Sequence, residues 1–381
     1  MSLPAVTNPF VPGRGQLPPY LAGREQEKKA MLGLLAYLKF GRGAPREAVL
    51  SGPRGNGKTA LLRWVVQEME DDGAIDAEWL TPSEFSGLDE LATRLVPPKR
   101  FDALRLDSVS VHVGVGKLGW KLEGQRGALT PLLKARCSRR PLVAVIDEAH
   151  TLPAEIGQTL LNASQSVCAQ APFLLIMAGT PGLQRHLNTM SATFWSRAEK
   201  LGIGRLDERA AAAALERPLA AQTPPIACSA DALREAVAAS QGYPYFVQLW
   251  GAALWEAVRE SGADQVDEAV VAAAAPTVGR SQSAYYQDRY QELEREGLIG
   301  LAASVAEAFA GRDSLPRKAL NGAIVNALPE GRNGTQEVLQ CRDRLSDLGY
   351  VWNPPDADDA WQSGIPSLMA YVADSAKTGF L

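Results

Sequence analysis

The sequence contains few of the residues that most often bind zinc or form disulfides. Among 381 residues there are 4 cysteines and 3 histidines. The cysteines are far apart, and no CxxC pair or Cys/His cluster occurs. This spacing favours neither a zinc site nor a disulfide framework. We therefore expect free thiols and a reducing, cytoplasmic environment.

Secretion signals and long apolar runs are also lacking. The first residues, Met1-Ser2-Leu3-Pro4, do not give a basic stretch followed by an apolar one, which is the pattern of a signal peptide. No apolar segment approaches the roughly 20 residues that a membrane-spanning helix needs. We therefore expect no membrane partner.

The chain as a whole lacks a strong charge of either sign. Its formal net charge is −4, and its 46% hydrophobic content is ordinary for a globular protein. The length predicts two or three domains. Basic residues nevertheless gather in residues 97–141, where ten Lys or Arg stand against three Asp or Glu, a net of +7. This basic segment is the candidate surface for a nucleic-acid partner.

The most specific motif lies at residues 52–59, which read Gly-Pro-Arg-Gly-Asn-Gly-Lys-Thr, a complete GxxxxGK[ST] sequence. An apolar run precedes it and a helical pattern follows it, which is the strand–loop–helix context of a phosphate-binding loop. Backbone N–H groups and the helix N-terminus would bind a polyphosphate. Lys58 would reach the β- and γ-phosphates, and the Thr59 hydroxyl would bind Mg²⁺. The loop residues expected to bind ATP are Pro53, Arg54, Gly55, Asn56, Gly57, Lys58, Thr59 and Ala60.

A pair of carboxylates forms the second motif. The apolar run 142–146 reads as a central parallel strand covered on both faces, and Asp147 and Glu148 follow it directly. Ligands bind at the carboxyl ends of such strands. Asp147 would hold Mg²⁺, and Glu148 would polarise the attacking water, which favours hydrolysis over binding alone. His150 is more typical of a packing or hydrogen-bonding residue.

The alternation of apolar strand-like runs with helical patterns predicts an α/β fold: a P-loop NTPase parallel-sheet core with a helical lid and a C-terminal winged-helix domain. The expected organisation is an extended amino-terminal arm over residues 1–22, the core over 23–206 with a β-hairpin insertion near 108–122, the lid over 207–280, and a winged-helix-like domain over 281–381.

With these motifs the chain resembles the AAA+/STAND class of P-loop ATPases. More narrowly, it is similar to archaeal and bacterial initiator-like ATPases with a winged-helix domain. The resemblance implies that Gly23 and Arg24 lie beside the adenine. It also implies that Thr180 senses the γ-phosphate and that Arg197 acts as an arginine finger on a neighbouring protomer. The alternatives are a strand-end turn residue for Thr180 and a surface arginine for Arg197.

The sequence departs from the initiator relatives in the lid. The phrase Gly242-Tyr243-Pro244 is similar to the lid motif in which the proline contacts the nucleotide. The relatives usually place an arginine there to contact the γ-phosphate, and this sequence has none at that place. The lid is therefore expected to sense the nucleotide by packing rather than by charge. The alternative is that Gly242 and Pro244 only separate two helices.

These observations predict an ATP-binding and ATP-hydrolysing switch that uses Mg²⁺ and forms a homo-oligomer. Two outputs remain open. The first is a DNA-associated assembly that binds nucleic acid through the basic segment. The second is a regulatory or defence ATPase whose winged-helix domain binds a protein partner. Residues 281–381 carry nine Lys or Arg against fourteen Asp or Glu, a net of −5, which is unfavourable for a duplex-binding domain.

Overall fold

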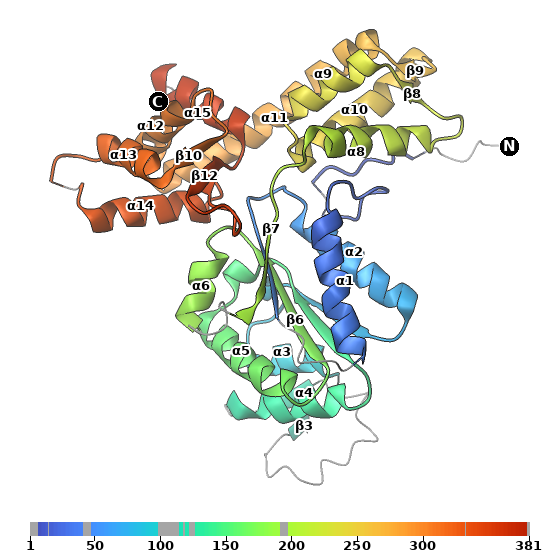
Figure 1. Ribbon diagram of the computed structural model, residues 1–381, viewed down its shortest axis with the longest axis vertical. Helices are drawn as coiled ribbons and strands as arrows, with labels where there is room; N and C mark the ends of the chain where they lie inside the picture. Colours follow the sequence, from blue (N-terminus) through green and yellow to red (C-terminus); the bar gives the residue numbers. More distant parts are fainter. Residues whose placement is uncertain are drawn as a thin grey trace. The chain divides into compact units, whose positions relative to one another are not determined.

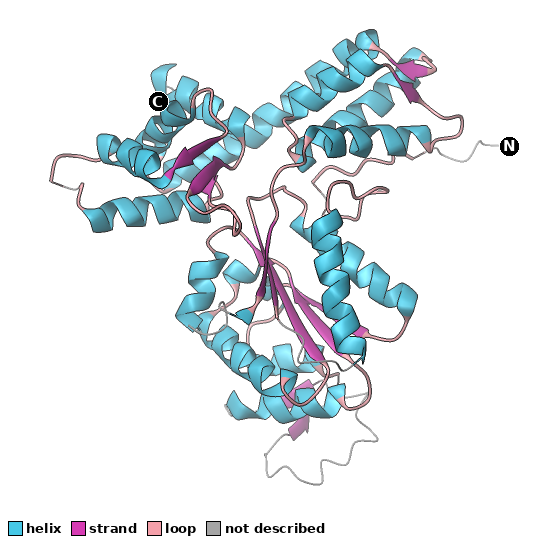
Figure 2. Ribbon diagram, in the orientation of Figure 1, coloured by secondary structure: helices cyan, strands magenta, loops and turns pink. Residues whose placement is uncertain are grey.

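The computed structural model (Figures 1 and 2) describes residues 7–13, 15–40, 47–97, 114–116, 119–121, 126–190, 197–331 and 333–378. The chain forms two compact units. The sheet unit comprises Gln26–Ser51 and Leu62–Leu201. The helical unit comprises Met1–Glu25, Gly52–Leu61 and Gly202–Leu381, so the phosphate-binding loop groups with the helical unit.

A five-stranded sheet forms the centre of the sheet unit. Its strand order is β2-β5-β6-β1-β7, and the β1–β6, β5–β6 and β2–β5 pairings are parallel. The strands are β1 Ala48–Ser51, β2 Asp76–Leu80, β5 Leu142–Ile146, β6 Phe173–Gly179 and β7 Glu199–Gly202. Every residue of β5 and β6 is buried, because helices cover both faces. The predicted α/β fold with a parallel sheet is confirmed.

One helix precedes the first strand, and others lie in the connections between the strands. They are α1 Glu25–Phe40, α2 Lys58–Asp72, α3 Leu88–Leu95, α4 Leu129–Cys137, α5 Ala154–Cys168 and α6 Leu183–Met190, with short 3₁₀ turns at Pro82–Glu84, Arg126–Ala128 and Ala149–Thr151. One apolar cluster joins α3, α4, α5 and α6 to alternate residues of the strands, such as Leu142, Ala144 and Ile146 of β5. This alternation shows that one side of each strand faces these helices.

The hairpin expected near residues 108–122 is described in part. The strands β3 Gly114–Gly116 and β4 Gly119–Lys121 pair antiparallel, with Val115 opposite Trp120. The rest of the predicted hairpin, and much of the basic segment, lies outside the described residues.

Four helices begin the main part of the helical unit: α8 Glu208–Ala220, α9 Ala230–Ser240, α10 Pro244–Ser261 and α11 Glu268–Arg295, with the short strands β8 Ala227–Cys228 and β9 Gln265–Val266. Three of these helices start with a side-chain cap, from Asp207, Ser229 and Asp267 respectively. Such caps satisfy N–H groups that have no partner within the helix. Phe10 of the amino-terminal arm is 4% exposed and joins the apolar core of these helices.

The chain then continues through α12 Ile299–Phe309, β10 Ser314–Pro316, α13 Arg317–Ala327, α14 Thr335–Asp347, β11 Val351–Trp352, β12 Ala360–Ser363 and α15 Pro366–Thr378. The three strands form an antiparallel sheet in the order β10-β12-β11. Tyr243 and Phe246 from the start of α10 share the apolar core of this carboxyl-terminal segment. The predicted lid boundary at residue 280 falls inside α11, which is 28 residues long.

In the parts of the chain that the structure describes, no helix is both long enough and apolar enough to cross a bilayer.

Candidate functional site

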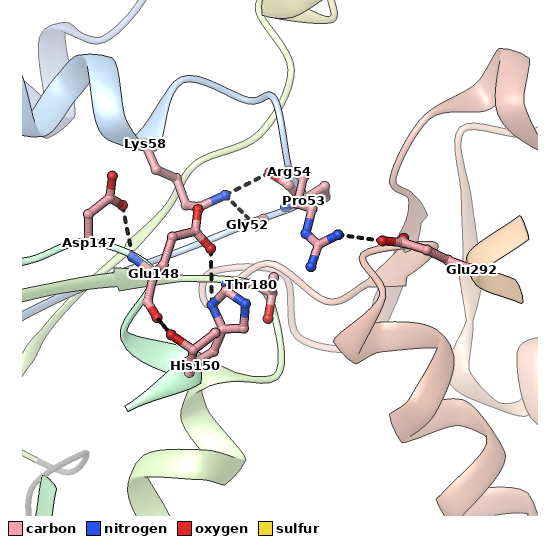
Figure 3. A network of polar contacts seen from close by, with 10 residues as sticks. Gly52, Pro53, Arg54, Lys58, Asp147, Glu148, His150, Thr180 and Glu292 are labelled. Atoms are coloured by element: carbon pink, nitrogen blue, oxygen red, sulfur yellow. Dashed lines mark hydrogen bonds and ion pairs between the residues drawn. The ribbon is translucent and has the colours of Figure 1, made fainter. Parts of the chain in front are cut away.

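The phosphate-binding loop joins β1 to α2, which begins at Lys58 (Figure 3). Gly55 and Gly57 have φ angles of +79° and +86°, a region that residues with a side chain rarely adopt. Gly52 is required for a different reason, because a Cβ there would overlap the Ile203 carbonyl oxygen. Backbone conformation thus explains Gly55 and Gly57, and close approach explains Gly52, while the GxxxxGK[ST] motif itself requires only Gly52 and Gly57.

Lys58 anchors the beginning of the loop. It is 6% exposed, and its Nζ donates hydrogen bonds of 2.9 Å to the carbonyl oxygens of both Gly52 and Pro53 (Figure 3). The ammonium group carries three donors on a flexible stem, so it can redirect a donor to a phosphate oxygen without leaving the loop. The binding of the β- and γ-phosphates by Lys58 stays a prediction.

Two further donors hold the middle of the loop. Arg24 Nη2 donates to the Asn56 carbonyl at 3.0 Å and to the Gly204 carbonyl at 2.6 Å. The Tyr243 hydroxyl donates to the Arg54 carbonyl. Together with the Lys58 bonds, these contacts engage four loop carbonyls with side-chain donors. The loop thus turns its carbonyl oxygens toward the protein, an arrangement that suits an anion cradle on its amide side.

The side chain of Asn56 is buried without a partner. Asn56 is 1% exposed, and among the described residues neither its Oδ1 nor its Nδ2 has a hydrogen bond. Buried amides of this kind are uncommon, since an unmade hydrogen bond costs about 1–3 kcal/mol. An unsatisfied polar group within a phosphate-binding loop fits a ligand that supplies polar atoms.

The Arg54 side chain points away from the loop toward helix α11. Its Nη1 lies 2.9 Å from Glu292 Oε1 (Figure 3). Arg289, one turn earlier on α11, lies 2.9 Å from the other carboxylate oxygen of Glu292. Glu292 is thus shared by two cations, one from the loop and one from its own helix.

Asp147 and Glu148 follow β5 at the carboxyl edge of the sheet. Asp147 is 7% exposed, its N–H continues the strand pairing to Leu80, and its Oδ1 accepts the Glu148 N–H at 3.0 Å. Glu148 has φ +53° and ψ +34°, a left-handed conformation that costs a residue with a side chain about 1–2 kcal/mol. Its side chain is 46% exposed, as a group that meets water requires.

His150 lies between Glu148 and Thr180. Its Nδ1 is 3.4 Å from Glu148 Oε2 and 3.5 Å from the Thr180 backbone nitrogen (Figure 3). A neutral Nδ1 accepts from the Thr180 N–H, whereas a protonated Nδ1 donates to the Glu148 carboxylate. The sequence predicts a packing or hydrogen-bonding residue at position 150, and in the structure His150 contacts Glu148 and Thr180, two of the predicted catalytic residues.

The remaining residues predicted from the sequence to lie at the site are explained only in part by the structure. Gly23 has φ +62°, and a Cβ there would overlap Ala210. Pro244 is the first residue of α10, where a missing N–H costs no hydrogen bond. Thr59 and Ala60 lie half-buried in the first turn of α2, and Arg197 is exposed. These contacts explain Gly23 and Pro244 structurally and leave their nucleotide roles as predictions.

No group of three or more His, Cys, Asp or Glu side chains arranged for metal binding occurs among the described residues. In a phosphate site, Mg²⁺ takes one or two protein oxygens and completes its shell with phosphate and water. Thr59 and Asp147 are the predicted protein ligands.

Several charges of the basic segment have partners. Arg136 is 3% exposed and forms an ion pair with Asp76, and Arg140 lies 3.3 Å from the same carboxylate. Lys134 donates to a glutamine side chain at 2.8 Å. The net charge counted from the sequence therefore overstates the charge available on the surface.

Residues 44–187 match the protein-family model described as an AAA domain. Comparison with curated proteins finds no match. Among solved structures, the Aeropyrum pernix ORC2 protein in its ADP form aligns with a TM-score of 0.56 at 17% identity, over 95% of this chain and 96% of that one. This similarity supports the fold over nearly the whole chain.

Two other solved structures are similar at lower scores. The Aeropyrum pernix ORC1 protein in complex with DNA aligns with a TM-score of 0.46 at 15% identity, over 95% of this chain and 94% of that one. The Thermotoga maritima RuvB Holliday junction branch migration motor aligns with a TM-score of 0.47 at 15% identity, over 90% and 92%.

Proposed function

We propose that the chain, in which residues 44–187 match an AAA domain and whose fold is similar to that of the ORC2 protein, binds ATP with Mg²⁺ and hydrolyses the ATP. The observation that carries the proposal is the loop between β1 and α2. Its carbonyl oxygens are held by Lys58, Arg24 and Tyr243, and its Asn56 amide is buried without a partner. A polyphosphate would supply the anion and the polar atoms that this loop suits.

In this proposal each motif residue has one role. Lys58 redirects its ammonium group from the loop carbonyls to the β- and γ-phosphates. Thr59 and Asp147 provide the protein oxygens of the Mg²⁺ shell. Glu148 polarises the attacking water from its exposed position at the end of β5. Thr180 would sense the γ-phosphate, with its backbone already linked to Glu148 through His150.

We further propose that the nucleotide state controls an assembly of several copies of the chain on DNA. The resemblance to initiator-like ATPases and the basic segment support this output, with Arg197 completing the site of a neighbouring copy. The lid would respond through packing, because the Gly242-Tyr243-Pro244 turn carries no arginine.

A protein partner is the alternative output. The observations that favour it are the pairing of Arg136 and Arg140 with Asp76, and the net charge of −5 over residues 281–381. Both reduce the positive charge available to a phosphate backbone. In this alternative the carboxyl-terminal segment contacts a protein and leaves DNA unbound.

Steady-state ATP turnover tests both levels of the proposal. The purified chain is assayed with Mg²⁺ alone, with double-stranded DNA, with single-stranded DNA and with EDTA. Turnover that needs Mg²⁺ and rises with DNA supports the DNA-associated switch. Turnover indifferent to both forms of DNA selects the protein-partner alternative, and absence of turnover under all conditions refutes the ATPase proposal.

A further inference from the structure

Tyr243 links the predicted lid to the phosphate-binding loop within the helical unit. It is 0% exposed and precedes the first residue of α10, and its hydroxyl donates to the Arg54 carbonyl. The same hydroxyl lies 3.0 Å from the hydroxyl of Tyr285 on α11. One phenol thus connects a loop that would bind phosphate with the start of α10, in the predicted lid, and with the part of α11 that follows the predicted lid boundary at residue 280.

The number of protons fixes the direction of these bonds. A phenol has a single O–H to donate, and the Arg54 carbonyl can only accept. Tyr243 therefore gives its proton to Arg54 and accepts the proton of Tyr285. Burial raises the pKa of Tyr243 well above 10, so the phenol keeps its proton, and its donor, at neutral pH.

The Tyr243 ring packs so close to Gly55 that there is no room for a side chain at position 55. A Cβ on Gly55 would overlap both the hydroxyl and the ring carbon that carries it. The GxxxxGK[ST] motif does not require glycine at this position, so the phenol gives a reason for Gly55 that the motif does not. The positive φ of Gly55, +79°, is a second and separate reason.

Arg54 is held at both ends. Its carbonyl accepts from Tyr243, and its guanidinium pairs with Glu292 on α11 at 2.9 Å. Arg289, which pairs with the same carboxylate, has its guanidinium 5.5 Å from the centroid of the Tyr285 ring. A change in the helices that carry Tyr243 and Glu292 would act on the loop through this one residue.

We propose that Tyr243 is the positioning residue through which the predicted lid sets the conformation of the phosphate-binding loop. It takes the place of a lid arginine, and it acts on the loop backbone rather than on the γ-phosphate. The effect of Tyr243 on nucleotide affinity rests on the proposed function. Its effect on the conformation of the loop does not depend on that function. Because the loop would bind phosphates common to ATP and ADP, Tyr243 affects both nucleotides equally. A γ-phosphate sensor would affect ATP alone.

Tyr243→Phe keeps the ring against Gly55 and removes the proton given to Arg54. Tyr286→Phe is the matched control, because Tyr286 belongs to the same aromatic cluster and donates to Ser367 Oγ at 2.7 Å, away from the loop. Amide hydrogen exchange of residues 52–59 is measured without nucleotide, and affinities for ATP and ADP are measured by calorimetry. Both substitutions remove one phenol hydrogen bond and are expected to lower the melting temperature.

In Tyr243→Phe the loop amides should exchange faster, and both nucleotides should bind roughly tenfold more weakly, because an unpaired Arg54 carbonyl lets the loop leave its binding conformation. The KM for ATP should rise by the same factor, with kcat within about twofold of the parent. Tyr286→Phe should show none of these changes. The loss of stability common to both variants cannot produce this difference.

Unchanged loop exchange in Tyr243→Phe would overturn the proposal and assign Tyr243 to packing alone. A loss confined to ATP would also overturn it, since that result belongs to a γ-phosphate sensor. Faster loop exchange in a protein that binds neither nucleotide would instead refute the proposed function and retain the role of Tyr243 on the loop.

Discussion

Glu148 adopts a backbone conformation that residues with a side chain rarely take. Among the described residues, Glu148 and Gln241 are the non-glycine residues with positive φ. Gln241 directly precedes the Gly242-Tyr243 turn, and Glu148 directly follows Asp147 at the end of β5. Strained residues of this kind persist where the surrounding structure holds them, and they cluster at functional positions. The backbone of Glu148 is thus an independent reason to assign it a role.

Glu148→Gln should retain ATP binding and lose turnover, because the amide has the shape of the carboxylate without its basicity. We expect kcat to fall by about 100-fold or more. Glu155→Gln, an exposed carboxylate at the start of α5, is the control and should keep parental turnover. A Glu148→Gln enzyme within a few-fold of the parent would show that another group activates the water.

The buried cysteines should be chemically inert. Burial raises the pKa of Cys137 from 9.0 to about 12, so at pH 8 about one thiol in ten thousand is the reactive thiolate. Alkylation of Cys137 by iodoacetamide should therefore be far slower in the folded protein than in urea.

Because the pKa of Cys137 is higher in the folded protein, the thiol of the unfolded chain loses its proton at lower pH. The contribution of Cys137 to stability is complete below about pH 9 and declines toward pH 12. Alkylation at equal rates in the two states would contradict the burial of Cys137.

At the scale of elements, local patterns identify the sheet and its motifs. The apolar run 142–146 forms β5, and the loop of residues 52–57 lies between β1 and α2 as predicted. Because neighbouring residues determine these features, they can be predicted from the sequence alone. The lid boundary expected at residue 280 is different, because it falls inside the 28-residue helix α11. The sequence pattern around residue 280 does not indicate whether a helix ends or continues there.

Contacts between distant segments could not be predicted. Tyr243 and Arg54 are 189 positions apart, and Glu292 is 238 positions from Arg54. A tyrosine in an apolar helix start reads as a core residue, and a glutamate in a long helix reads as a solvated one. One sequence feature does indicate a close contact with the loop: Gly55 is a glycine that the motif does not require.

The basic segment is tested by charge reversal. Lys117→Glu with Lys121→Glu should weaken DNA binding on all sequences and lower its salt dependence by about two counterions, while ATP affinity stays unchanged. Arg312→Glu with Lys318→Glu makes the same change in net charge on exposed residues of the carboxyl-terminal segment and serves as control. Equal effects of the two pairs would show a general charge effect. Unchanged DNA binding in the first pair would exclude these two lysines as a DNA contact.

At the scale of the whole molecule, the proposed site is incomplete within one copy. Arg197 is assigned to a neighbour's nucleotide, which requires that the chain assemble. Mixing Arg197→Ala protein with Lys58→Ala protein should restore part of the turnover that each lacks, because an intact loop then meets an intact arginine. Turnover of the parent should rise more steeply than protein concentration. A monomer with concentration-independent specific activity would contradict the shared site.

The central claim is that the loop of residues 52–59 binds ATP, and calorimetric titration of ATP with Mg²⁺ tests it most directly. Lys58→Ala should bind ATP at least about 30-fold more weakly than the parent, since a charge-assisted contact to phosphate is lost. Lys39→Ala is the control, because Lys39 pairs with Asp72 on the surface, and it should bind as the parent does. Parental affinity in Lys58→Ala, or no binding by the parent, would contradict the account.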